Sequence, residues 1–153
     1  MLQWYVGGLL AALATSWIAA LFHSRGIAPI GLVSVGVGLV LGASLAALAA
    51  TGRRPQGGRV AGRRRLIIGT LVLALATALA QHAWLYLDFR RQWQEARTKS
   101  AEVALFRPET PWSPAEYFAR ELTAQNAALW ALDACLIAVS ALGVVMLWQR
   151  QQE

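Results

Sequence analysis

Charge is scarce in this chain. Only 14% of the residues are charged, whereas 57% are hydrophobic and the mean hydropathy is +0.45. Soluble domains typically carry about 25% charged residues. An ordinary soluble domain is therefore not the first expectation, and the composition favours a protein whose helices are surrounded mainly by lipid.

Cysteine is nearly absent. The single residue, Cys135, excludes an intramolecular disulfide, a CxxC redox pair and a zinc site built from thiolates. It lies within an apolar run, where a lone cysteine usually behaves as a small hydrophobic residue. We expect it to be buried.

Catalytic and cofactor motifs are also missing. The pair Gly57-Gly58 lacks the strand, helix and GK[ST] context of a phosphate loop. No two carboxylates are spaced for acid and base catalysis, and no soluble scaffold is present to hold a Ser/His/Asp arrangement. The sequence therefore predicts a protein that is not an enzyme and binds no cofactor.

What the chain does have is four long apolar runs. They cover about 2–22, 29–50, 66–86 and 130–148. A hydrocarbon core of about 30 Å needs about 20 helical residues at 1.5 Å per residue. The first run could instead be a signal peptide, but no Lys or Arg precedes it, so we expect a retained span. The expected fold is an all-α membrane protein, a single membrane domain over 1–153 with four transmembrane helices.

Arginine is concentrated between the second and third runs. Residues 51–65 hold six arginines and no acidic residue: Arg53, Arg54, Arg59, Arg63, Arg64 and Arg65. Lys and Arg in short loops favour the cytoplasmic side, and each contributes about 1 kcal/mol near an anionic lipid surface. We expect this loop to fix the topology of the chain and to anchor it at the lipid surface. An acidic cytoplasmic partner or RNA is the less favoured alternative, and the chain carries no basic surface typical of nucleic-acid binding.

The same loop predicts the orientation of the whole chain. With four spans, the N- and C-termini share the side of residues 51–65, so both are expected in the cytoplasm. The compartment we expect is a bacterial inner (plasma) membrane. The segment between the third and fourth spans, about 87–129, then lies on the extracytoplasmic side.

The third helix is expected to continue beyond the membrane. Residues at alternating spacings of four and three extend past its apolar part: His82, Tyr86, Phe89, Trp93 and Ala96. This heptad-like spacing is typical of one continuous helical face. We expect the helix to reach about residue 104.

A turn and a new helix follow. Pro108 and Pro111 cannot continue a helix, whereas Ser113, Pro114 and Glu116 form a capped start. Apolar residues then recur at three and four without a break into the fourth span. The sequence therefore predicts an antiparallel helical hairpin whose arms are the outer parts of the third and fourth helices.

The tip of this hairpin is the surface best suited to a protein partner. It holds Arg107 and Trp112, and we expect the Trp112 side chain to be exposed. Arginine and tryptophan are enriched where protein interfaces gain most of their binding energy.

Small residues form a line along the second run. Ser34, Gly38, Gly42, Ala46 and Ala50 are spaced four apart. Such a line lets two helices approach closely in lipid, where the hydrophobic effect no longer drives them together. It predicts packing against another span of the same chain, or alternatively a homo-oligomer formed through this face.

Polar side chains gather near the outer ends of the spans. They are His23, Gln81, His82 and Asp133. In a straight hairpin, residues whose numbers sum to roughly 217 face each other, so His82 should lie near Asp133 or Cys135. Asp133 is the only acidic residue in any expected span, and a carboxylate at a helix centre costs about 2.5 to 3.5 kcal/mol.

Three roles are open for this polar cluster. Asp133 could pair with His82 or Arg25 and join two helices, the cluster could handle protons or a ligand, or Asp133 could simply be hydrated from outside. The residue types also suit zinc, but no HxxxH or HxxE spacing fixes a geometry, so no metal site is expected.

Two functions follow from these features. The first is a non-catalytic accessory, scaffold or assembly subunit that presents the extracytoplasmic hairpin for a protein–protein interaction. The alternative is a small transporter or channel with a polar site in the outer leaflet around Asp133 and His82.

Overall fold

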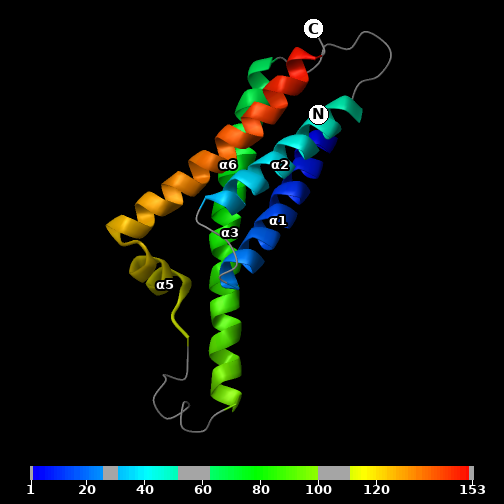
Figure 1. Cartoon of the computed structure of the whole chain (residues 1–153). Helices are drawn as coiled ribbons and strands as arrows, with labels where there is room; N and C mark the ends of the chain where they lie inside the picture. The colour runs from blue at the N-terminus through cyan, green and yellow to red at the C-terminus, as the bar shows by residue number, and fades with distance from the viewer. Residues whose placement is uncertain (1, 26–30, 52–62, 100–110, 152–153) are drawn as a thin grey trace.

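A computed structural model describes residues 2–25, 31–51, 63–99 and 111–151. Five helices and no strand occur in these ranges. The helices are α1 (Leu2–Ser24), α2 (Leu32–Thr51), α3 (Arg63–Lys99), α5 (Pro114–Glu121) and α6 (Ala124–Arg150). Figure 1 shows α1, α2, α3 and α6 as a bundle and α5 as a short helix beside its lower half.

The prediction of an all-helical chain with four candidate spans is confirmed. The helices α1, α2, α3 and α6 are each long and apolar enough to cross a membrane. Large hydrophobic side chains on their outer surfaces are exposed, among them Leu10, Val72 and Val139. An outward apolar surface of this kind suits a lipid surrounding.

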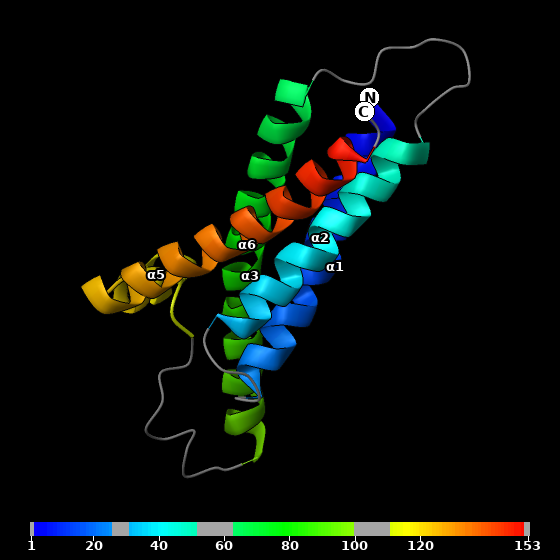
Figure 2. The same cartoon turned by 45° about the horizontal axis from the view of Figure 1, so that its top comes forward.

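The four long helices form a ring in which each contacts two principal neighbours. The helix α1 packs against α2 and α3, and α6 packs against the same two helices. The starts of α1 and α3 lie at one end of the bundle together with the ends of α2 and α6 (Figures 1 and 2). Thus α1 and α3 run in one direction, and α2 and α6 run in the other.

Small residues bring α2 close to α6. A Cβ added to Gly38 would lie 2.6 Å from the backbone oxygen of Ile137, and one added to Gly42 would lie 2.7 Å from that of Ala141. Only glycine allows this approach of two backbones. The line of small residues therefore packs against α6 within the chain, and a second copy could reach it only if α6 moved away.

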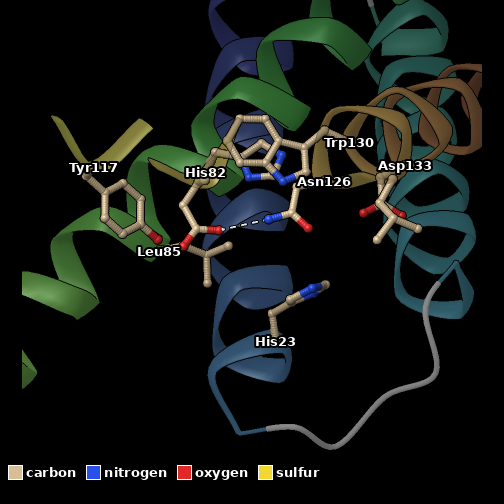
Figure 3. A pocket seen from close by; sticks show the side chains of 9 residues that line it. His23, His82, Leu85, Tyr117, Asn126, Trp130 and Asp133 are labelled. Atoms are coloured by element: carbon tan, nitrogen blue, oxygen red, sulfur yellow. Dashed lines mark hydrogen bonds between the residues drawn. The ribbon is translucent and has the colours of Figure 1, made fainter. Parts of the chain in front are cut away.

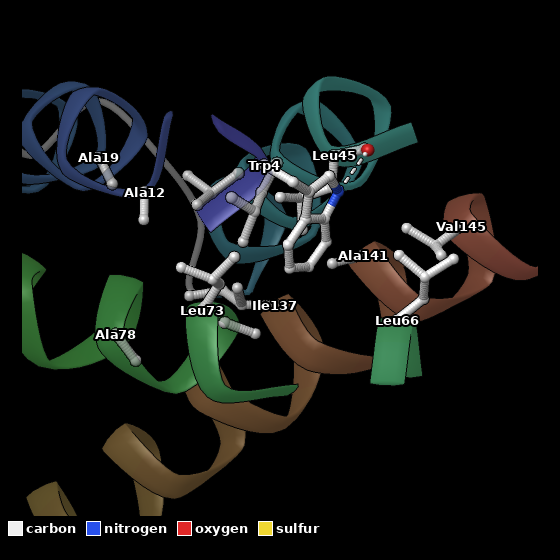
Figure 4. Packing of buried hydrophobic residues seen from close by; sticks show 13 residues of the cluster. Trp4, Ala12, Ala19, Leu45, Leu66, Leu73, Ala78, Ile137, Ala141 and Val145 are labelled. Carbon is white, nitrogen blue, oxygen red and sulfur yellow. Dashed lines mark hydrogen bonds between the residues drawn. The ribbon is translucent and has the colours of Figure 1, made fainter. Parts of the chain in front are cut away.

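A buried tryptophan joins three helices at the end of the bundle where α1 and α3 begin. Trp4 is only 8% exposed, and its indole N–H donates to the backbone oxygen of Leu45 at 3.1 Å (Figure 4). Gly69 makes room for the indole, because a Cβ there would lie 2.7 Å from the ring. One side chain near the start of α1 thus joins it to both α2 and α3.

The helix α3 extends well beyond its neighbours. It has 37 residues, and Figure 1 shows its C-terminal part continuing past the end of α1. This agrees with the expected continuation of the third helix, which is described as far as Lys99. The expected end at about residue 104 lies outside the described residues.

The prediction that one helix runs without a break from Ser113 into the fourth span is wrong. Leu122 leaves the helical region with φ −77° and ψ 50°, and Thr123 is extended with φ −68° and ψ 157°. The Thr123 hydroxyl accepts a hydrogen bond from the backbone N–H of Asn126 and so caps a new helix. The chain therefore bends between α5 and α6, and the straight antiparallel hairpin is replaced by a short helix folded beside α3.

Cys135 also differs from the expectation of burial. Its side chain is exposed on α6. The face of α6 that packs into the bundle carries Asp133, Ile137, Ala141 and Val145 at intervals of four. Cys135 lies off this line, so it faces outward.

Candidate functional site

A cavity with polar side chains lies where the end of α1, the middle of α3 and the start of α6 meet α5. Its volume is about 200 Å³, and its lining comes from α1, α3, α5 and α6 (Figure 3). The lining residues are His23, His82, Leu85, Tyr117, Glu121, Asn126, Leu129, Trp130 and Asp133. Residues far apart in the sequence thus form one site.

Asp133 joins α6 to α2. Its Oδ1 atom accepts a hydrogen bond of 2.6 Å from the Ser34 hydroxyl, and both side chains are buried. Ser34 belongs to the same line of small residues as Gly38 and Gly42, so the close approach of α2 and α6 brings the hydroxyl to the carboxylate. A buried carboxylate needs such a donor.

His82 is stacked on Trp130. The two ring centroids are 3.8 Å apart and the ring planes differ by 28°. His82 is also close enough to Asp133 and His23 to interact with them electrostatically. The stack fixes the imidazole at the wall of the cavity, between α3 and α6.

Two lining residues come from either side of the bend after α5. The Asn126 amide donates a hydrogen bond of 3.4 Å to Glu121 Oε2 across that bend. Tyr117 lies one turn before Glu121 on α5. Burial, with a smaller contribution from the charge of Glu121, raises the pKa of the Tyr117 phenol above its ordinary value of 10.

Aromatic contacts hold α5 beside α3. The Tyr86 hydroxyl donates to the backbone oxygen of Trp112 at 3.1 Å, and its ring lies 5.3 Å from that of Tyr117. Phe89 stacks on Trp112 with centroids 5.5 Å apart, and Arg120 lies 4.3 Å from the Trp112 ring centroid. Aromatic and cation–π pairs each contribute about 0.5 to 1.5 kcal/mol beyond burial.

A capping box starts α5, as the sequence predicts. The Ser113 backbone N–H donates to Glu116 Oε2 at 2.8 Å, and the backbone N–H of Glu116 donates to the Ser113 hydroxyl. Glu116 Oε2 also accepts from the Ser113 hydroxyl at 2.9 Å, and the bonds that it accepts from the Ser113 backbone and side chain hold the pKa of Glu116 below its ordinary value of 4.5.

The structure brings three of the four expected polar residues together. His23, His82 and Asp133 line the cavity, whereas Gln81 is buried but does not line it. No ion pair joins Asp133 to His82 or to Arg25 among the residues that the structure describes. Its hydrogen bond comes instead from Ser34, which sequence reasoning had noted only for its size.

The cavity contains no recognisable metal centre. Within 2–25, 31–51, 63–99 and 111–151, no group of three or more His, Cys, Asp or Glu side chains is placed to hold a metal ion. His23, His82 and Asp133 therefore share a cavity without converging on one point.

The other expected sites are placed as follows. Contrary to the expectation, the Trp112 side chain is not exposed. Its ring is half-buried between Phe89 and Arg120. Arg64 and Arg65 are exposed at the start of α3, and Ala50 is exposed at the end of α2. Arg53, Arg54, Arg59 and Arg107 lie outside the described residues, and Arg63 begins α3.

Sequence reasoning missed the contribution of the segment around the bend. Tyr117, Glu121 and Asn126 line the cavity because the chain turns at Leu122. The available signal was Thr123 with Asn126 three residues later, a pattern that suits a helix cap.

Comparison with known proteins finds no protein to which this chain is similar. No family model matches the chain, and neither the search of curated proteins nor that of solved structures finds a significant match.

Proposed function

We propose that this chain is a non-catalytic accessory or scaffold subunit of a membrane complex, which presents the outer part of α3 to a partner protein. The length of α3 carries the proposal. Of its 37 residues, about 20 suffice to cross a bilayer, which leaves about 17 residues, or roughly 25 Å of helix. A helix that continues so far is available for contacts outside the lipid.

The two faces of this outer part differ. One face carries Tyr86 and Phe89 and is covered by Trp112, which precedes α5, and by Tyr117 of α5. The opposite face is exposed and polar, with Arg90, Arg91, Gln94, Glu95, Thr98 and Lys99. The carboxylate of Glu95 pairs with Arg91 at 2.9 Å and with Lys99 at 3.9 Å, which supports a regular helix there.

The proposal includes an orientation. The start of α1, the end of α2, the start of α3 and the end of α6 share one end of the bundle (Figure 2). We propose that this end, with the arginines of residues 51–65, faces the cytoplasm of a bacterial inner membrane. The cavity and the outer part of α3 then face the other side.

Replacement of the polar face tests the partner proposal. The triple variant Arg90→Ala, Arg91→Ala, Gln94→Ala should insert normally but lose partner proteins that co-purify with the full chain in mild detergent. Arg150→Ala, at the opposite end, is the matched control and should retain them. Identical co-purifying proteins from both variants would contradict the proposal.

A small transporter or channel is the second candidate. The cavity supports it, because polar side chains from α1, α3 and α6 meet at one end of the bundle. The fully buried side chains of Leu41, Leu45 and Ile137 fill the interior beyond the cavity, so transport would require the helices to rearrange. Solute flux into proteoliposomes that Asp133→Asn abolishes would support it; an inert protein over a broad solute panel would exclude it.

A further inference from the structure

We propose that the cavity binds a small organic ammonium ion. The inference rests on the site of the second candidate function, but it concerns binding alone and does not require transport. It follows from the charge of the lining, the hydrogen-bond groups left open in it, and the mixture of polar and apolar walls.

The lining carries negative charge without a permanent positive charge. Asp133 and Glu121 contribute carboxylates, and no Lys or Arg belongs to the described lining. Charges attract more strongly near protein walls than in bulk water, because the effective dielectric constant falls to about 20. A cation is therefore favoured over a neutral or anionic ligand.

Hydrogen-bond acceptors are in excess at this site. Asp133 receives one hydrogen bond, from Ser34 to Oδ1, and no described residue donates to its Oδ2 atom. Among the residues that the structure describes, the Glu121 carboxylate receives only the long contact from the Asn126 amide. Since each carboxylate offers about four lone-pair positions, the cavity suits a ligand with several N–H donors.

Size and the apolar walls restrict the ligand further. Drug-sized molecules occupy pockets of about 300 to 1,000 Å³, whereas this cavity measures about 200 Å³. Leu85, Leu129 and the Trp130 ring supply apolar surface that an alkyl group can cover. A short alkyl chain with a primary ammonium group matches both kinds of wall.

Propylammonium is the probe, and the full chain in detergent micelles is the sample. Titration calorimetry should detect saturable binding of propylammonium at pH 7, where the amine is protonated. The dissociation constants of n-propanol and propionate, which match its length but lack its charge, should each be higher by about tenfold or more.

Two variants locate the binding site. Asp133→Asn keeps an acceptor for Ser34 and should raise the dissociation constant for propylammonium about tenfold. Glu121→Gln should also weaken binding, and it lies on α5, outside the four-helix bundle, so it remains informative if the first variant folds poorly. Glu95→Gln removes an exposed acid outside the cavity and should bind as the unmodified chain does.

Three results would overturn the inference: no saturable binding of propylammonium, equal affinity for n-propanol, or equal weakening by Glu95→Gln. Propylammonium binding without flux of any solute would exclude the transport candidate and leave this inference standing. Flux of another solute without ammonium binding would overturn this inference and support the transport candidate.

Discussion

At the residue scale, the contact between Ser34 and Asp133 has two roles. It supplies a donor to a buried carboxylate, and it joins the start of α2 to the middle of α6. Hydrogen bonds between transmembrane helices contribute on average about 0.6 kcal/mol, and bonds to charged groups contribute about 1.5 to 3 kcal/mol. The bond is therefore expected to contribute measurably to stability as well as to the arrangement of the two helices.

Replacing Ser34 measures this contribution. Ser34→Ala should lower the free energy of unfolding by about 0.5 to 2 kcal/mol, because Asp133 loses its donor while remaining in place. Reversible unfolding in mixed micelles gives the value. Ser44→Ala is the control, since its hydroxyl donates only to the backbone oxygen of Val40 in its own helix. Equal losses in the two variants would contradict the assigned role.

The sequence pointed to Asp133 but not to its partner. As the only acid in an expected span, Asp133 stood out at once. The partner depends on which helices become neighbours, and α2 and α6 are far apart in the chain. The expected partners were His82 and Arg25, and His82 was expected because a straight hairpin was assumed.

At the element scale, the glycines of α2 fall into two groups, those that face another helix and one that faces open space. Gly38 and Gly42 contact the backbone of α6, whereas a Cβ added at Gly36 would have no atom within 4 Å. The spacing of small residues predicted a packing face, and periodicity alone could not say which helix would cover it. Which helices become neighbours depends on the packing of the whole bundle.

This division gives a matched pair of variants. Gly38→Ala should lower the free energy of unfolding by about 1 to 3 kcal/mol, because the added methyl group forces α6 away. Gly36→Ala should leave it unchanged or slightly raised, since alanine favours helix over glycine. Unfolding of both proteins in the same micelles is the measurement. Equal destabilisation would argue that α2 and α6 are not in this contact.

The capping box makes the start of α5 sensitive to acid. The folded pKa of Glu116 is lower than its value in an unfolded segment, so its stabilising contribution is complete above about pH 4.5 and is lost as the pH falls through the folded pKa. Hydrogen exchange at α5 amides, corrected for the intrinsic pH effect, should accelerate below that pH. In Glu116→Gln the side-chain oxygen can still accept from the Ser113 N–H but does not titrate, so the corrected exchange should show no such acid step. A step of the same size in both proteins would assign it to another group.

The bend before α6 shows where element prediction failed. Apolar spacing ran smoothly from α5 into α6 and so predicted one helix. The cap at Thr123 and the aromatic contacts of Trp112 and Tyr117 with α3 favour the bend instead. Such tertiary contacts have no signature in local periodicity.

At the scale of the whole molecule, the number and kind of the long helices could be predicted. Four apolar runs of sufficient length were enough, because a bilayer fixes the length of a span. Their ring arrangement could not be predicted, and neither could the burial of Trp4, since a tryptophan near a helix end is equally typical of a membrane interface.

Topology is testable by labelling. In a Cys135→Ala background, Gln94→Cys on the outer part of α3 should react with a membrane-impermeant maleimide added to intact cells. Gln56→Cys and Gln151→Cys should react only after the membrane is opened. The reason is the positive charge of the loop that contains Gln56. Labelling of Gln56→Cys in intact cells would reverse the proposed orientation.

The contact between α2 and α6 also bears on how the protein is made. Because α6 is synthesised after α2, α3 and α5, the glycine face of α2 remains without its partner while α3 and α5 are completed. A growing or truncated chain therefore presents that face to whatever membrane helix is nearby. The nascent protein can therefore pair wrongly through this face until α6 has been made and has packed against α2.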